Sequence, residues 1–184
     1  MKRHTLVYAL IFSALMAPSA NAQSNIGLKR LGVAVGFVDP EGLDGTFSLG
    51  VFANHGTVAP RIGLESRIDY WGSSQSFFGS EFSFRDIAIG ARGKYLFQVS
   101  NPKIQPFAGT GLALHFYHSE MTVQTPSGPQ SADASSTKLG LDLGGGISTP
   151  VGPRADFLAE LWYGIASDVD QFSLRIGMSR KLGI

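Results

Sequence analysis

Alternation of apolar and polar or small residues, with a period of two, is the feature that most constrains the fold of this chain. This alternation recurs eight times after the first two dozen residues. In that same part of the chain no segment shows the 3.6-residue apolar stripe of a helix. In the first run Leu31, Val33 and Val35 alternate with Gly or Ala. The runs predict eight β-strands, at residues 30–38, 44–54, 58–70, 82–97, 103–117, 137–149, 154–166 and 170–183.

The connections between these strands differ in length in a regular way. Residues 71–81 and 118–136 are long, polar and rich in Ser, Gly, Pro and Gln, and we expect them to be loops. The other links are brief. Long connections at one end and short ones at the other are typical of up-and-down membrane β-barrels. Phe82 and Phe84 fall out of phase with the rest of their strand, which predicts a bulge near Arg85.

Charged residues make up 16% of the chain, and they gather on one face of the predicted strands. Fourteen of them share the face opposite the apolar one, with both signs mixed. The interior of an eight-stranded barrel is just wide enough to be filled by side chains, so we expect these charges to pair across it. The predicted lumen network is Arg30, Arg61, Glu65, Arg67, Asp69, Asp86, Arg92, Lys94, Lys138, Asp142, Asp156, Glu160, Arg175 and Lys181.

Aromatic residues of the apolar face fall at two heights if the strands run up and down. One group reaches the rim with the long connections: Phe37, Phe47, Tyr70, Phe116, Tyr163 and Phe172. The other reaches the opposite rim: Tyr95, Phe97 and Phe157. Two aromatic girdles around an aliphatic band are typical of a surface that faces lipid, whereas a soluble core has no reason to sort aromatics by height. The sequence therefore predicts an all-β, eight-stranded antiparallel transmembrane β-barrel.

The N-terminus has the pattern of a secretory signal peptide. Lys2 and Arg3 precede an apolar run of about a dozen residues, and small residues at Ala20 and Ala22 form an Ala-x-Ala cleavage site. We expect cleavage after Ala22, which leaves residues 23–184 as one barrel domain. The chain has no Cys, so disulfides and thiolate metal sites are excluded.

Catalytic chemistry is weakly indicated. Glu65 with Asp69, and Asp156 with Glu160, could form acid/base pairs, but neighbouring arginines favour salt bridges. His115 and His118 could serve a hydrolase or hold a metal ion, but no motif accompanies them. We therefore expect no catalytic, cofactor or metal site. The chain has 15 basic and 14 acidic residues, so it carries no large net positive charge that would attract a nucleic acid.

These segments resemble the small outer-membrane β-barrel proteins of the OmpA-transmembrane-domain, OmpX and opacity-protein type. Residues 106–112 are similar to their Pro-aromatic-x-Gly-x-Gly strand, 159–163 to their Ala/Arg-Glu-x-x-Tyr strand, and 172–179 to their closing strand. The resemblance implies residence in the bacterial outer membrane, contact with its lipid and insertion by the barrel-assembly machinery. Members usually end in an aromatic residue, whereas this chain ends in Leu182, Gly183 and Ile184.

Three hypotheses about function remain open at this point. The first is a non-enzymatic outer-membrane protein that supports the envelope or meets an extracellular partner through 71–81 and 118–136. The second is an enzyme acting on outer-leaflet lipid with a histidine at the rim. The third is a soluble periplasmic barrel that holds an apolar ligand inside. The inward placement of charge favours the first.

Overall fold

The computed structural model describes residues 25–77, 80–101, 103–167 and 169–182. Nowhere in these ranges is there a helix that is long and apolar enough to cross a membrane. The expected signal peptide, residues 1–22, lies outside the described part of the chain. The strands are β1 (Asn25–Pro40), β2 (Thr46–Ala59), β3 (Ile62–Phe77), β4 (Ser80–Leu96), β5 (Gln105–Thr125), β6 (Gly128–Pro150), β7 (Ala155–Ala166) and β8 (Gln171–Lys181).

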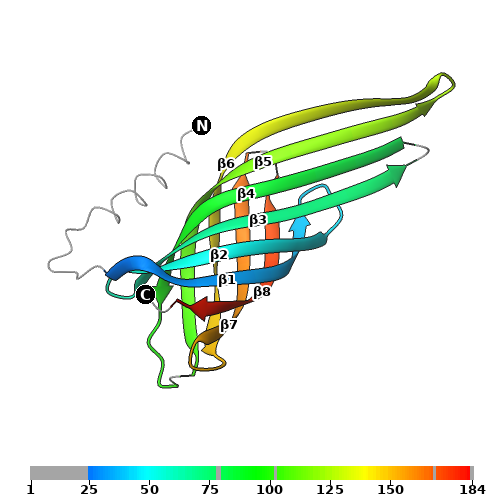
Figure 1. Cartoon of the computed structure of the whole chain (residues 1–184). Coiled ribbons are helices and arrows are strands. Elements are labelled where there is room, and N and C mark those ends of the chain that lie inside the picture. Colours follow the sequence, from blue (N-terminus) through cyan, green and yellow to red (C-terminus); the bar gives the residue numbers. More distant parts are fainter. Residues whose placement is uncertain (1–24, 78–79, 102, 168, 183–184) are drawn as a thin grey trace.

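The eight strands form one closed antiparallel barrel in sequence order (Figure 1). Each strand pairs with its neighbours in the chain, and β1 closes the ring against β8, from Arg30 opposite Lys181 to Pro40 opposite Gln171. Closure leaves no open sheet edge within the barrel wall, so the backbone amides and carbonyls there have partners. The predicted fold class, an eight-stranded all-β barrel, is confirmed.

Two hairpins extend well beyond the barrel wall, and the expectation that their residues are loops is wrong. Past Trp71, β3 has no ladder pairing with β2, and β6 pairs with β7 only from Gly140 onward. Segments 71–77 and 80–81 continue β3 and β4, and 118–125 and 128–136 continue β5 and β6. Figure 1 shows these four strands projecting past the others. Their polar composition resembled that of a loop because a hairpin in water needs no apolar outer face.

The bulge expected near Arg85 is also absent. Pairing of β4 with β3 and with β5 runs in continuous register through Phe82, Phe84 and Asp86. Phe82 and Phe84 thus share the inner face of the barrel with Asp86. Phe84 stacks on Trp71 with ring centroids 5.5 Å apart, and its ring lies 5.3 Å from that of Tyr117. Along β4 the apolar side chains therefore change from the outer face to the inner face near the hairpin rim, while the backbone pairing stays regular.

We name the two ends of the barrel by their connections. The hairpin rim carries the β3–β4 and β5–β6 extensions. The turn rim carries the β2–β3 turn at 60–61, the β4–β5 connection at 97–104 and the β6–β7 turn at 151–154. Arg61 sits in the first of these turns with φ of 65°, a left-handed conformation that a two-residue turn requires.

Glycine on the inner face lets neighbouring strands hold bulky side chains, and Gly144, beside Trp162, is one such position. A Cβ placed there would lie 2.3 Å from the Leu161 carbonyl oxygen and 2.7 Å from the Trp162 ring.

We predict that Gly144→Val lowers the free energy of unfolding by about 1–3 kcal/mol or prevents folding, because the core is overpacked. Urea titration of the refolded barrel measures this. Gly152→Ala is the control, since an added methyl there meets no atom within 4 Å, and an equal loss in both would contradict the prediction.

Candidate functional site

Polarity in this barrel is inverted relative to a water-soluble protein. Among the described residues, 33 large apolar side chains are exposed and only 11 apolar residues are buried. The exposed set covers the outer face of all eight strands; Val33, Leu112 and Leu139 are each more than half exposed. Soluble monomers rarely expose contiguous apolar patches larger than a few hundred Å². The outer wall therefore requires an apolar environment, and the polar chemistry lies inside.

An alternating chain of four acidic and four basic side chains crosses the lumen. Lys94 Nζ donates to Glu65 Oε2 at 2.5 Å and to Glu160 Oε1 at 2.6 Å. Glu160 Oε2 lies 3.8 Å from Arg92 Nη1, which continues the chain across the barrel. These four residues come from β3, β4 and β7, so the contacts tie together strands on different sides of the barrel wall.

Asp142 and Asp69 continue the same chain toward β6 and β8. Asp142 Oδ2 accepts from Arg92 Nε at 3.3 Å and from Arg67 Nη2 at 2.5 Å. Arg67 also pairs with Asp69, and Arg175 Nη2 lies 3.1 Å from Asp69 Oδ1. All eight members of the chain are buried. A buried charge is tolerated when it is paired, and here each one contacts at least one group of opposite sign.

The structure places thirteen of the fourteen predicted lumen residues on the inner face, seven basic and six acidic. Besides the eight-membered chain, His115 Nδ1 lies 2.7 Å from Asp86 Oδ2, Arg30 pairs with Asp156, and Lys138 is half-buried with an interaction partner. Lys181 stands opposite Arg30 in the inward phase of β8, but it is exposed at the end of the strand. Arg61 lies elsewhere, exposed in the β2–β3 turn, where its Nη2 donates to Gln98 Oε1 at 2.7 Å.

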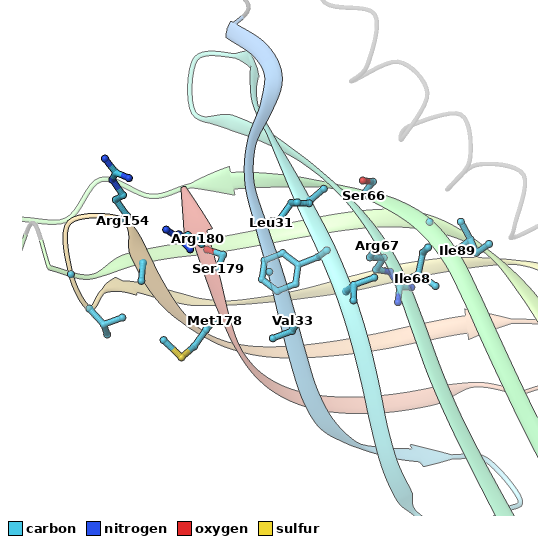
Figure 2. A pocket seen from close by; sticks show the side chains of 18 of the residues that line it. Leu31, Val33, Ser66, Arg67, Ile68, Ile89, Arg154, Met178, Ser179 and Arg180 are labelled. Carbon is cyan, nitrogen blue, oxygen red and sulfur yellow. The ribbon is translucent and has the colours of Figure 1, made fainter. Parts of the chain in front are cut away.

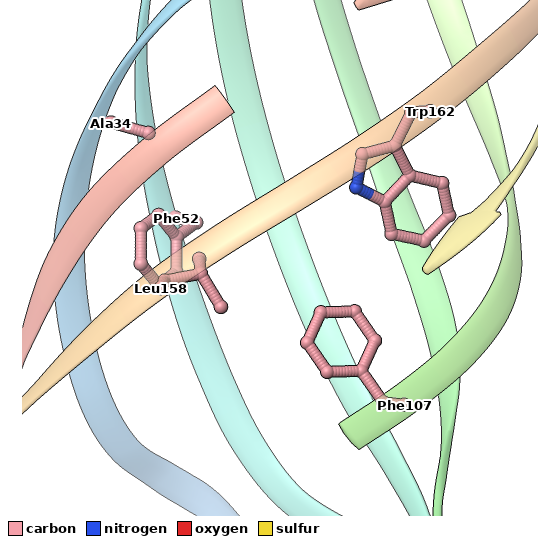
Figure 3. Packing of buried hydrophobic residues seen from close by; sticks show 5 residues of the cluster. All are labelled: Ala34, Phe52, Phe107, Leu158 and Trp162. Carbon is pink, nitrogen blue, oxygen red and sulfur yellow. The ribbon is translucent and has the colours of Figure 1, made fainter. Parts of the chain in front are cut away.

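An apolar cluster shares the lumen with the charges. It consists of Ala34, Phe52, Phe107, Leu158 and Trp162, drawn in Figure 3. The Arg92 guanidinium carbon lies 3.8 Å from the centroid of the Trp162 ring, and Lys94 Nζ lies 4.6 Å from that of Phe107. Cation–π contacts of this kind let the charged side chains pack directly against the apolar cluster.

Aromatic rings cover the charges on the hairpin-rim side. Tyr117 stacks on His115 at 5.5 Å and contacts Phe84, which stacks on Trp71. Between this layer and the arginines lies a cavity of about 20 Å³, lined among others by Arg67, Arg92 and Arg175. Such a volume holds roughly one water molecule. The filled lumen argues against a wide diffusion pore.

Eight of the nine predicted girdle aromatics lie on the outer face of a strand, and Phe97 directly follows the end of β4. Eight are between 41% and 83% exposed, and Phe157 is half-buried. Phe37 meets Phe47 edge-on near the hairpin rim, with centroids 6.4 Å apart, and Tyr95 meets Phe97 at 5.1 Å near the turn rim. Between the rims the outer wall is aliphatic; Figure 2 shows part of it, where Leu31, Val33 and Met178 line a shallow hollow.

The residues considered for catalysis are engaged in ion pairs or hydrogen bonds. The four carboxylates Glu65, Asp69, Asp156 and Glu160 are each engaged by a cation. His115 is 1% exposed and sits inside the barrel, while His118 is on the outer face of the extension, 3.0 Å from Ser135 Oγ. In the described ranges no three His, Cys, Asp or Glu residues are grouped so as to hold a metal ion.

Inward aromatics are the part of the interior that the sequence analysis missed. Phe52, Trp71, Phe107 and Tyr117 are buried in the lumen, although apolar residues were assigned to the outer face. The sequence did contain a signal for these inward aromatics. Each of them stands one position away from the alternating apolar residues that face outward on its strand. Strand phase, rather than hydrophobicity, identifies them.

Comparison with solved structures finds the same architecture in bacterial proteins. Neisserial surface protein A (NspA) superposes with a TM-score of 0.66 at 18% identity, over 86% of this chain and 100% of that chain. A major outer membrane protein from Thermus thermophilus gives 0.59 at 14% identity, over 85% and 100%. Ail, the attachment invasion locus protein of Yersinia pestis, gives 0.53 at 13% identity, over 84% and 97%. At these identities the likeness shows the fold alone.

The sequence matches no protein-family model and no curated protein sequence at a significant level. Membership of the OmpA, OmpX or opacity-protein family is therefore not shown. The shared fold is that of small outer-membrane eight-stranded barrels.

Lys94 is the cation on which two buried carboxylates depend, and its removal tests the lumen network. We predict that Lys94→Met lowers the free energy of unfolding by about 3–5 kcal/mol, because Glu65 and Glu160 keep buried charges without their shared partner. Urea unfolding followed by tryptophan fluorescence measures the loss. Arg61→Gln removes an exposed charge and should change stability by less than about 0.5 kcal/mol. Equal effects of the two substitutions would show that the lumen pairs contribute no stability.

Proposed function

We propose that this protein is a non-enzymatic integral protein of the bacterial outer membrane, exported by its N-terminal signal and inserted by the barrel-assembly machinery. One observation carries the proposal: a closed barrel with apolar side chains exposed over its whole outer wall and with paired charges buried inside. Every backbone group of a closed barrel can be satisfied within hydrocarbon, and the aliphatic outer wall suits lipid.

The protruding hairpins are the part of the molecule that we propose for contact with partners outside the cell or with neighbouring envelope components. Their outer face is polar, as at Ser74, Ser76 and Thr122, so it is suited to water rather than lipid. Their inner face carries Phe82 and Met121, and Met121 is 48% exposed. A rigid four-stranded sheet that stands clear of the wall offers side chains to a partner without disturbing the barrel.

The two alternatives are less consistent with the geometry. A soluble barrel that binds an apolar ligand needs an apolar cavity, whereas the cavity in the lumen is about 20 Å³ and lined by arginine and aspartate. An enzyme acting on lipid needs an accessible group at the rim. His115 is buried within the barrel, and His118, on the outer face of the extension, contacts Ser135 and makes no ion pair with an acidic side chain in the described ranges.

Placement of an arginine on the outer wall distinguishes lipid from water as the surroundings. Val51 is about half exposed and lies opposite Val33 and Ile68 on the neighbouring strands. We predict that Val51→Arg weakens folding into lipid vesicles by about 2–4 kcal/mol, the cost of arginine near a bilayer midplane. Ser76→Arg, on the outer face of the hairpin extension, should leave folding unchanged.

The readouts are urea titration in vesicles, cell fractionation and the shift in gel mobility on heating. Wild-type protein recovered in the soluble periplasm without detergent would refute the membrane assignment. Equal tolerance of arginine at both positions would contradict a lipid-facing wall.

Substitution of both histidines tests the enzymatic alternative. We predict that cells carrying His115→Gln together with His118→Ala have the same lipid A mass spectrum as cells carrying the wild-type protein, because neither side chain forms part of a catalytic group. Gel mobility on heating confirms that the variant is folded. A change in lipid A acylation in the folded variant would favour the enzyme.

A further inference from the structure

Charge is distributed unevenly between the two ends of the barrel. Within the described ranges, the charged residues at the turn rim outside the eight-membered chain and the Arg30–Asp156 pair are all basic: Lys29, Arg61, Lys103, Arg154, Arg180 and Lys181. The carboxylate nearest to them in the sequence, Asp156, is paired with Arg30. At the hairpin rim, by contrast, acidic residues such as Asp39, Glu41 and Asp44 predominate. The turn rim thus presents a positive potential to whatever surrounds it.

Two of these basic residues, Arg154 in the β6–β7 turn and Arg180 on β8, stand on neighbouring segments and line one hollow. Arg180 is paired with Leu31 on β1 and Ala155 on β7, and it follows Met178 in the outward column of β8. Arg154 directly precedes β7, and its carbonyl accepts from the Lys181 amide at 2.7 Å, which holds the two segments side by side. Both arginines are exposed, and within the described ranges neither has a carboxylate at ion-pairing distance.

An aliphatic surface leads from these two guanidinium groups up the barrel wall. Leu31, Val33 and Met178 line the same shallow hollow as Arg154 and Arg180, and each of the three is about half exposed or more. Figure 2 shows the five side chains on neighbouring strands, with the arginines near the turns. The hollow is therefore amphipathic, cationic at the rim and apolar along the wall.

We propose that this hollow binds one anionic phospholipid from the membrane leaflet at the turn rim. Guanidinium groups bind phosphate oxygens in a bidentate fashion, so the two arginines that line the hollow supply groups suited to a lipid phosphate. The acyl chains lie along Leu31, Val33 and Met178. A zwitterionic headgroup is disfavoured because it brings its own cation to a rim that already carries an excess of positive charge. The inference rests on the proposed membrane location and names the lipid that the barrel selects there.

The test uses the full barrel purified in detergent, with folding verified by the mobility shift on heating. Native mass spectrometry then compares retention of phosphatidylglycerol with that of phosphatidylcholine of the same acyl chains. We expect wild-type protein to retain phosphatidylglycerol, and Arg154→Gln with Arg180→Gln to lower this retention about tenfold, to the level of phosphatidylcholine. Unchanged retention in the double variant would overturn the site.

Arg61→Gln with Lys103→Gln is the matched control, since it removes two charges from the same rim but from turns away from the hollow. It should retain phosphatidylglycerol as the wild type does, and an equal loss would show a diffuse electrostatic ring instead of a site. Full displacement of the lipid by millimolar inorganic phosphate would also overturn the proposal, because it would assign the site to free anion. A barrel that folds without lipid preference contradicts the site alone, whereas a barrel that stays soluble without detergent contradicts the proposed function.

Discussion

Closure of the sheet by β1 and β8 is the constraint from which the rest of the structure follows. A ring of eight strands has a narrow interior, so side chains that point inward are buried whatever their chemistry. Arg67, Asp142 and Glu160 are buried for this reason. Burial of a charge is tolerated only with a partner, and ion pairs between strands that are distant in the chain satisfy that condition. The closed ring thus produces both the polar lumen and the exposed apolar wall.

The lumen is organised in layers along the barrel axis. Paired charges and the cluster around Trp162 together fill the middle, and the Trp71, Phe84 and Tyr117 rings cover the charges toward the hairpin rim. The small cavity between them leaves no room for a substrate. Whatever this barrel does with other molecules takes place on its outer wall, its rims and its protruding hairpins. The lumen serves to hold these surfaces in place.

The strands were predictable because each carries its own period-two pattern, which depends only on neighbouring residues. The ends of β3, β4, β5 and β6 at the hairpin rim were not predictable in this way. Their outer face changes from apolar to polar at the point where these strands leave the barrel wall. There Phe82 and Phe84 point inward and serine points outward, so a rule that reads apolar as outward places them on the wrong face. Arg61 was misassigned for a different reason, because a tight turn interrupts the alternation on which its assignment rested.

The sequence by itself determined that this chain forms antiparallel strands with one charged face and one apolar face, because alternation along a strand fixes which side chains share a face. The sequence also contained the acidic and basic residues that can pair with one another inside the barrel. Tertiary structure alone decided which charge meets which. Lys94 lies between Glu65 and Glu160, and Asp142 lies between Arg67 and Arg92, only because closure brings β3, β4, β6 and β7 around one narrow axis. The physical reason is that pairing across a lumen depends on barrel diameter and strand stagger, which no single strand encodes.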